Sequence, residues 1–123
     1  MLNYILLELM NNYSVSSQNE HIHKILKYID EHINEQLSLR IISKEINLSR
    51  EYTSYIFKKE MSTTLTDYIN ERKLLLAKEL ISRQNMTLSQ VAQHISFDNY
   101  NYFCRLFKKH FGISPGQYMR SLN

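Results

Sequence analysis

The sequence is poor in the residues that break helices or cross-link chains. Two glycines and one proline in 123 residues leave little scope for the tight hairpins of a many-stranded sheet. Cys104 is the only cysteine, which excludes a disulfide within this chain and makes a reducing cytosol the expected setting. Tryptophan is absent as well, but this excludes no fold. The composition therefore favours helices with short connections.

Long apolar runs are missing too. The apolar stretch over residues 4–10 contains Glu8 and is far too short to span a bilayer. It also lacks the basic segment of a signal peptide. With 43% hydrophobic and 22% charged residues, we expect a globular, soluble, cytoplasmic protein of one ordinary domain or two very small ones.

The chain begins with apolar residues at helical spacing. Four of them form one stripe of a short N-terminal helix: Leu2, Ile5, Leu6 and Leu9. So short a helix needs a surface to pack against. Residues 13–18 contain several serines and predict a linker. We therefore expect residues 1–18 to form a helical stub and linker, followed by a helix over about 19–34.

N-cap residues mark the starts of the remaining helices. In chain order, the expected N-caps are Ser38, Ser49, Thr64, Thr87, Asp98 or Asn99, and Ser114. The helix that starts after Thr64 should be long and reach Ser82. Asn47 and Gly112 tolerate the left-handed conformation in which a helix commonly ends. Together with the helix over about 19–34, these six helix starts predict an all-α fold of seven helices besides the N-terminal stub, and no strand pattern competes.

Two segments, 39–69 and 88–119, carry the same pattern. Seven residues of the first recur fifty positions later: Tyr52, Phe57, Lys58, Lys59, Met61, Thr64 and Tyr68 match Tyr102, Phe107, Lys108, Lys109, Phe111, Ser114 and Tyr118. The helix before each matches at an offset of forty-nine instead, as Ile42, Ile46 and Leu48 against Val91, Ile95 and Phe97. Because an insertion inside a helix would rotate its apolar face, the extra residue should lie in or near the second turn. The duplication predicts two helix-turn-helix units, which points to DNA.

The positive charge follows the duplication. Residues 1–35 carry two Lys/Arg and five Asp/Glu, a net charge of −3, whereas residues 36–123 carry thirteen and seven, a net charge of +6. A basic surface is what contact with phosphates requires. An ordinary lysine-rich surface would show the same balance, so charge alone does not choose between them.

One run in the second copy is distinctive. It comprises Val91-Ala92, Ile95, Phe97, Tyr102-Phe103, Arg105, Phe107-Lys108-Lys109, Phe111-Gly112, Ser114-Pro115 and Tyr118. With its degenerate first copy, it resembles the DNA-binding domain of the AraC/XylS family of bacterial transcription regulators, over about residues 19–121. The sequence departs from the family at Ser96 and Ser62, where glycine is usual, and at Ser43, where alanine is usual. The turn at Ser96 should therefore be slightly strained or differently shaped.

The resemblance implies two homeodomain-like helix-turn-helix lobes joined by a long connector helix over 65–82. We accordingly expect a first lobe with the start of the connector (19–69), the rest of the connector (70–85) and a second lobe (86–123). A helix of about 18 residues is ~27 Å long, whereas successive turns of the DNA major groove are ~34 Å apart. This mismatch predicts bent DNA, or contacts concentrated under one lobe, unless the lobes are offset from the ends of the connector.

The family motif also implies which residues face DNA bases. In the second lobe they are Tyr100, Asn101, Cys104 and Arg105, and the matching residues of the first lobe are Arg50, Glu51, Ser54 and Tyr55. Arginine binds guanine O6 and N7 bidentately and asparagine binds adenine N6 and N7, so Arg105 is the strongest candidate. Glu51 can accept from cytosine N4, or it can simply complement the dipole of its helix.

Six further residues are candidates for contacts with the DNA backbone: Ser38, Arg40, Lys58, Thr87, Ser89 and Lys108. The two lysines come late in the second helix of each lobe, where they can reach phosphates or complement the C-terminal dipole. The other four lie at N-termini of first helices, which favour phosphate. An ordinary solvated surface position is the alternative for each.

The predicted function is sequence-specific binding of double-stranded DNA that regulates bacterial transcription, by activation if the chain follows the family. RNA polymerase is a further expected partner, as is a preceding sensor or dimerisation domain that covers the stripe of Leu2, Ile5, Leu6 and Leu9. The alternative is a protein-interaction module that binds another regulator or the polymerase instead of DNA. Such a module would not need polar and basic side chains at Asn101 and Arg105.

No catalytic, metal or cofactor site is expected. The sequence has no phosphate-binding glycine loop, zinc-hydrolase motif or nucleophile–base pair, so we do not expect an enzyme. His21 and His23 are two residues apart, so they do not share a helix face and should be surface histidines rather than metal ligands. Cys104 is expected to be a small packing or groove residue rather than a redox sensor.

Overall fold

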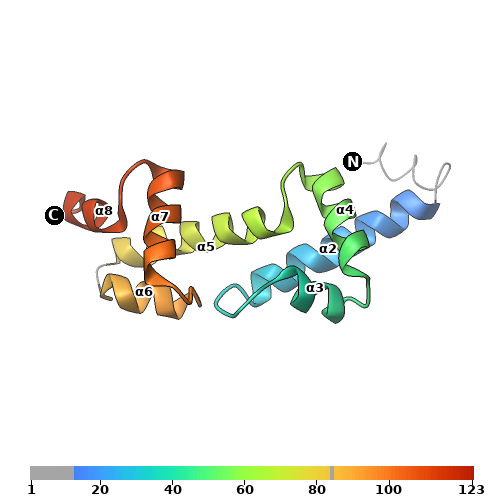
Figure 1. Ribbon diagram of the computed structural model, residues 1–123, viewed down its shortest axis with the longest axis horizontal. Helices are drawn as coiled ribbons and strands as arrows, with labels where there is room; N and C mark the ends of the chain where they lie inside the picture. The colour runs from blue at the N-terminus through green and yellow to red at the C-terminus, as the bar shows by residue number, and fades with distance from the viewer. Residues whose placement is uncertain (1–12, 84) are drawn as a thin grey trace. The chain divides into compact units, whose positions relative to one another are not determined.

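The structure, a computed structural model, describes residues 13–83 and 85–123, and every regular element in these ranges is a helix. In chain order, the helices are α2 (Tyr13–Glu31), α3 (Leu39–Glu45), α4 (Arg50–Met61), α5 (Leu65–Ser82), α6 (Leu88–His94), α7 (Tyr100–Phe111) and α8 (Pro115–Ser121) (Figure 1). The predicted all-α fold is confirmed. The predicted N-terminal stub, with Leu2, Ile5, Leu6 and Leu9, lies outside the described residues.

Helix α2 differs from its predicted range at both ends. It begins at Tyr13, so the prediction of a linker over residues 13–18 is wrong. Serine is less favourable than alanine in a helix by less than about 0.7 kcal/mol, and this segment has no glycine or proline to interrupt the helix. At its other end α2 stops at Glu31 rather than near Asn34.

The chain divides into two compact units, each containing one helix-turn-helix. Of the described residues, the first unit comprises Tyr13–Glu31 together with Ser38–Leu65, and so contains α2, α3 and α4. The second unit comprises His32–Leu37 together with Thr66–Asn123, and so contains α6, α7, α8 and nearly all of α5. The short segment between α2 and α3, residues 32–37, thus belongs to the second unit.

Helix α4 is the centre of the first unit, and both α2 and α3 pack against it. The buried side chains of these three helices are mostly isoleucine: Ile22, Ile25, Ile29, Ile42, Ile56 and Phe57. Two hydroxyl groups are buried among them. Ser43 Oγ donates to the Arg40 carbonyl at 3.2 Å, and Thr53 Oγ1 donates to the Ser49 carbonyl at 2.7 Å. Each buried hydroxyl therefore has a partner on its own helix or cap, which removes the penalty for burying it.

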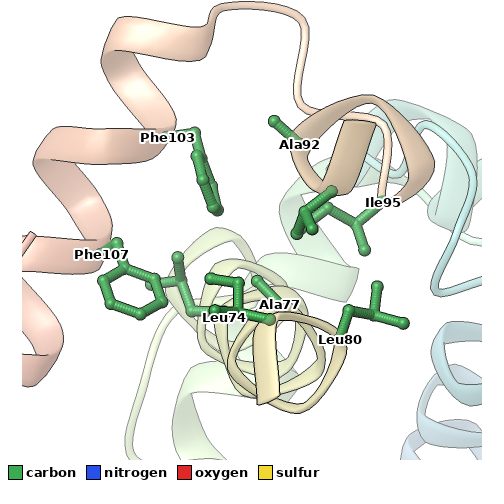
Figure 2. Close-up of a cluster of buried hydrophobic side chains, with 9 residues drawn as sticks. Leu74, Ala77, Leu80, Ala92, Ile95, Phe103 and Phe107 are labelled. Atoms are coloured by element: carbon green, nitrogen blue, oxygen red, sulfur yellow. The ribbon is translucent and has the colours of Figure 1, made fainter. Parts of the chain in front are cut away.

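In the second unit, α6 and α7 both pack on α5 (Figure 2). The fully or nearly fully buried side chains are Leu74, Ala77, Leu80, Ile81, Val91, Ala92, Ile95, Phe103 and Phe107. The Phe107 ring also lies 4.6 Å from the ring of Phe111 and 6.0 Å from that of Tyr118, measured between centroids. Burying one phenylalanine side chain stabilises a fold by about 1.5–3 kcal/mol, so the inner face of α7 is a large part of this core.

The turn inside the second helix-turn-helix is one residue longer than that in the first. Residues 46–49 separate α3 from α4, whereas residues 95–99 separate α6 from α7. The predicted insertion is therefore confirmed, and it lies in the turn. Asn47 and Ser96 occupy matching positions of the two turns, with φ of 59° and 60°. A serine in this left-handed region is strained relative to glycine, as the sequence predicted for Ser96.

Candidate nucleic-acid interface

The two helices that the repeat predicts to read DNA, α4 and α7, begin with the same capping geometry. Ser49 Oγ accepts a hydrogen bond from the backbone N–H of Tyr52 at 3.0 Å. Asn99 Oδ1 accepts one from the backbone N–H of Tyr102, also at 3.0 Å. Each cap satisfies an N–H group that has no partner within the first helical turn. The caps therefore start both recognition helices at corresponding positions of the repeat.

Helix α7 has an aromatic inner face and a polar outer face. Phe103 and Phe107 are fully buried, whereas Tyr100, Asn101 and Arg105 are exposed. Cys104 is half-buried at the edge between the two faces. The four residues predicted to face bases thus lie on the solvent side of α7 or at its margin.

Tyr100 and Cys104 interact one helical turn apart. Partial burial, followed by the hydrogen bond and the charge interaction with Cys104, raises the pKa of the Tyr100 hydroxyl above its ordinary value. Tyr100 is therefore neutral at physiological pH. In that form its hydroxyl group can both donate to and accept from a base edge.

Arg105 contacts an aromatic ring on its own helix. Its guanidinium carbon lies 5.7 Å from the centroid of the Tyr102 ring, which is a cation–π contact. This contact restricts the conformations of a long side chain before it binds anything, so less entropy is lost when it binds. The sequence analysis did not include Tyr102 among the site residues. Its position three residues before Arg105, on the same helix face, was the available signal.

Helix α4 presents a different set of side chains. The residues predicted from the repeat are all exposed: Arg50, Glu51, Ser54 and Tyr55. Among the large hydrophobic residues that the structure describes, Tyr55 is the most exposed, at 58%, and Lys59 Nζ lies 5.8 Å from its ring centroid. Glu51 lies in the first turn of α4, a position that suits a base contact and a helix-dipole contact alike.

Lysines occupy the opposite end of both recognition helices. Lys58 and Lys108 are exposed in the last turns of α4 and α7. Lys59 and Lys109 follow them, also exposed. The predicted basic side chains are therefore accessible to an anion such as a DNA phosphate.

The remaining candidates lie at the N-termini of α3 and α6. Arg40 and Ser89 are exposed. Ser38 Oγ accepts from the Ile41 N–H and Thr87 Oγ1 accepts from the Gln90 N–H, both at 3.1 Å. The two hydroxyl oxygens are thus used as N-caps. Each hydroxyl group still has its proton, which it can donate to a phosphate oxygen.

One buried lysine, Lys73, was not predicted from the sequence. Lys73 on α5 is only 4% exposed, and its Nζ donates to the backbone carbonyls of Ile33 at 2.6 Å, Glu35 at 2.8 Å and Ile95 at 2.5 Å. Burial lowers the pKa of Lys73 to about 8, and the charge of Glu35 opposes the shift. A signal for it was present in the sequence. Lys73 lies four residues after Ile69 and four before Ala77, both buried, and so occupies an apolar position of the helix.

Within residues 13–83 and 85–123, no group of three or more His, Cys, Asp or Glu side chains could hold a metal ion. No helix in the same ranges is long and apolar enough to cross a membrane. The His21 ring packs edge-on against Tyr52 with 5.9 Å between centroids, whereas His23 is exposed. The two histidines thus lie on different faces of α2.

Comparison with known proteins points to the same architecture. A family model described as a helix-turn-helix domain matches residues 42–121. The regulatory protein PocR of Salmonella typhimurium is 28% identical over 100 residues, which are 81% of this chain and 33% of PocR. The regulatory protein SoxS of Escherichia coli is 28% identical over 106 residues, which are 86% of this chain and 99% of SoxS.

A solved structure supports the same assignment. The C-terminal domain of AraT, a response regulator from Geobacillus stearothermophilus, matches with a TM-score of 0.78 and 26% identity, over 82% of this chain and 84% of that domain. The chain thus spans about a third of the length of PocR and nearly all of SoxS. The region matched by the family model includes both recognition helices and the two helices between them, and the chain belongs to the AraC/XylS family of DNA-binding transcription regulators.

Proposed function

We propose that the chain reads an asymmetric site on double-stranded DNA, with α7 and α4 each presenting its exposed face to base edges in the major groove. The main observation in support is the exposed face of α7. Asn101 and Arg105 are exposed there, whereas Phe103 and Phe107 on the opposite face are fully buried. A recognition helix is anchored by its apolar face and leaves its polar face to the DNA.

The residues of α7 have distinct roles in this proposal. Arg105 binds guanine O6 and N7 through its two outer N–H groups, and Asn101 binds adenine N6 and N7. The contact with Tyr102 supports the role of Arg105, since it holds the guanidinium group near the exposed face. Tyr100 contributes a hydroxyl group, and the half-buried Cys104 contributes a small apolar contact such as one with a thymine methyl group.

The residues of α4 give the other half of the site a different preference. Arg50 can bind guanine, and Glu51 can accept from cytosine N4. Ser54 and Tyr55 occupy the positions of Cys104 and Arg105 in the repeat. Because the two faces differ at every matched position, the two half-sites should differ in sequence.

Side chains at both ends of each helix-turn-helix bind the DNA backbone in this proposal. Lys58 and Lys108 contact phosphates from the C-terminal ends of the recognition helices, together with Arg40 on α3. Hydroxyl groups donate to phosphates from the N-terminal ends of the first helices, and they belong to Ser38, Thr87 and Ser89. Five of the six residues are exposed, all but the half-buried Ser38, and the cap geometry of Ser38 and Thr87 also supports this assignment.

One chain supplies both recognition helices, so binding does not require a dimer. Helix α5 is unbroken over 18 residues and is therefore about 27 Å long, less than the ~34 Å between successive turns of the major groove. Bending of the DNA, contacts concentrated under one lobe, or lobes offset from the ends of α5 would each account for this difference. Probes with the site at different distances from the DNA ends would report the bend.

The wider role that we propose is activation of bacterial transcription in the cytoplasm, in contact with RNA polymerase. PocR extends well beyond the matched region, which supports a further sensor or dimerisation domain. The apolar stripe of Leu2, Ile5, Leu6 and Leu9 would contact such a domain. None of these roles involves catalysis.

The experiment that tests the DNA proposal is selection from a random DNA pool, followed by affinity measurement at several salt concentrations. If about five to seven phosphates are neutralised, log K falls with log salt at a slope of about −5 to −6. Lys108→Ala should weaken binding to all sequences alike and flatten the slope by about one unit. The matched control is Lys27→Ala on α2, an exposed lysine to which no DNA contact is assigned. A salt-independent affinity, or no bound sequence in the pool, would contradict the proposal.

A second candidate function is that of a protein-interaction module. Exposed aromatic residues on the recognition helices favour it, since Tyr55 is 58% exposed and Tyr100 and Tyr102 are each 40% exposed. Aromatic side chains are enriched in protein interfaces. The same selection experiment decides between the two functions, because a pure interaction module would select no DNA sequence.

A further inference from the structure

The turn that leads into α7 is hydrogen-bonded to side chains from other parts of the second unit. Lys73 on α5 donates to the Ile95 carbonyl at 2.5 Å. Gln36 Nε2 donates to the Ser96 carbonyl at 3.2 Å and to Asp98 Oδ1 at 2.6 Å. In the opposite direction, Ser96 Oγ donates to the Asn34 carbonyl at 2.7 Å. The side chains of Lys73, Gln36 and Ser96 thus join the segment 32–37 to the turn 95–99.

These bonds fall on the residues that set the path of the chain into α7. Ile95 is the C-cap of α6, and Ser96 follows it in the left-handed conformation with φ of 60°. Asp98 directly precedes Asn99, the N-cap of α7. Between them, the Phe97 ring lies 5.4 Å from that of Phe103. A shift at any of these residues would be transmitted to the start of the recognition helix.

The chemistry of Lys73 matches its surroundings. A lysine ammonium group has three N–H donors, and here it meets three carbonyl oxygens, those of Ile33, Glu35 and Ile95. Hydrogen bonds from a charged donor are stronger than those between neutral groups. An apolar side chain of similar length would leave the three carbonyl groups without this donor. At 4% exposure, Lys73 itself is not available to a phosphate.

We propose that Lys73 is a positioning residue for DNA reading, which holds the Ile95 carbonyl and so fixes how α7 presents Asn101 and Arg105. Gln36 and Ser96 support the same turn. Residues 32–37 therefore serve the second helix-turn-helix, although they precede the first in sequence. The inference rests on the proposed base-reading role of α7. Hydrogen bonds weaken steeply away from their preferred distance and angle, so a small shift of α7 lowers base discrimination before it lowers attraction to phosphates.

The test compares Lys73→Met with Lys73→Arg and with the matched control Lys27→Met, which removes an exposed lysine from α2. For each variant of the 123-residue chain, the affinity for the best site is divided by the affinity for sites with a single base-pair substitution, across both half-sites. A correct base pair is worth about 1–3 kcal/mol, which is a ratio of about 5 to 150. Lys73→Met should lower this ratio at least about threefold under α7, with unchanged ratios under α4 and an unchanged salt slope. Lys73→Arg, which retains charged N–H donors, should keep most of the wild-type ratio.

The ratio separates positioning from a loss of folded protein, because a smaller folded fraction weakens binding to every sequence equally. If Lys73→Met folds poorly, Gln36→Ala replaces it in the comparison. Hydrogen exchange of the backbone amides of residues 95–101 then gives a second measure of how firmly the turn is held. If the ratio under α7 is the same in the wild type, in Lys73→Met and in Gln36→Ala, the positioning role is wrong. A wild-type protein without base discrimination under α7 would instead overturn the proposed function. A salt slope flattened by one unit in Lys73→Met would show direct phosphate contact and also overturn the inference.

Discussion

The first recognition helix, α4, belongs to a core of mostly isoleucine side chains with two buried hydroxyl groups, whereas the inner face of the second, α7, is itself a row of aromatic rings. The turn before α4 has four residues, and the turn before α7 has five and is hydrogen-bonded to Lys73 and Gln36. The helix lengths nevertheless agree, at 7 and 12 residues in both repeats. Capping and helix length are thus retained between the repeats, while core chemistry and turn support differ.

The exposed faces differ as much as the cores. At matched positions Glu51 corresponds to Asn101, and Tyr55 corresponds to Arg105. The second face is the one that carries the side chains typical of base recognition. We infer from this comparison that α7 provides most of the sequence discrimination and α4 a smaller share.

The largest expected effect concerns the aromatic core. Phe107→Ala should destabilise the protein by about 3–5 kcal/mol, because it removes a fully buried ring and leaves a cavity among the rings of Phe103, Phe111 and Tyr118. Chemical denaturation measures the loss, and hydrogen exchange should place it in α5–α8. The control Tyr55→Ala, at an exposed position, should change stability by no more than about 0.5 kcal/mol. Equal loss of protection in α2–α4 would show that the two units do not unfold separately.

A smaller effect is expected from the matched pair on the reading faces. Arg105→Ala should weaken binding to the best site by about 1–3 kcal/mol and relax the preference at one base pair. Tyr55→Ala, at the matching position of α4, should cost less, because tyrosine does not make the bidentate contact of arginine. Repeating the DNA selection with each variant measures both effects. An unchanged motif for Arg105→Ala, or a larger loss for Tyr55→Ala, would reverse the assigned order of the two helices.

The buried Lys73 predicts that the stability of the second unit depends on pH. The pKa of Lys73 is lowered to about 8 in the folded protein, below its ordinary value of 10.5. Between these values the unfolded chain binds the additional proton, so the free energy of unfolding should rise with pH by at most about 1.4 kcal/mol per pH unit. Below pH 8 Lys73 is protonated in both the folded and the unfolded state, so it adds no pH dependence to the free energy of unfolding. Denaturation of the wild type and of Lys73→Met from pH 7 to pH 10 measures it, since the variant lacks the group. A difference between the two proteins that stays constant or falls with pH would contradict this pKa.

The smallest effect tests the ends of the recognition helices. Ser62 ends α4 with φ of 61°, and Gly112 ends α7 with φ of 86°. Ser62→Gly should stabilise the protein by about 1 kcal/mol, and Gly112→Ser should destabilise it by a similar amount. A Cβ at residue 112 would meet no heavy atom within 4 Å, so this cost is conformational rather than steric. Effects of the same sign in both variants would show that the two ends are not equivalent.

Most of the fold could be predicted from the sequence because its signals are local. The caps Ser38, Ser49, Thr87 and Ser114 were predicted correctly, since a short side chain at the right spacing determines each of them. Helix α5 also has its predicted bounds, Leu65–Ser82, which the resemblance to the family implied. The start of α2 was missed, because serine-rich composition is a weak signal when no glycine or proline accompanies it.

The support of α7 could not be predicted in the same way, because it depends on contacts distant in sequence. Lys73 bonds to carbonyl groups 38 and 40 residues earlier in the chain, and Gln36 bonds to Asp98 at a separation of 62. A backbone carbonyl carries no sequence signal, so the partners of Lys73 could not be identified from composition or periodicity. The exposed faces of α4 and α7 followed from the repeat, but which bases they contact stays a prediction.

The measurement that tests the central claim most directly is the base-by-base affinity profile of the selected DNA site, determined together with the number of chains bound. One chain should protect two groove segments about one helical turn apart, and the motif should be asymmetric. Discrimination should be greater under α7, and Arg105→Ala should reduce it only there. A palindromic motif that binds only two chains, with one recognition helix of each making no base contact, would contradict this account.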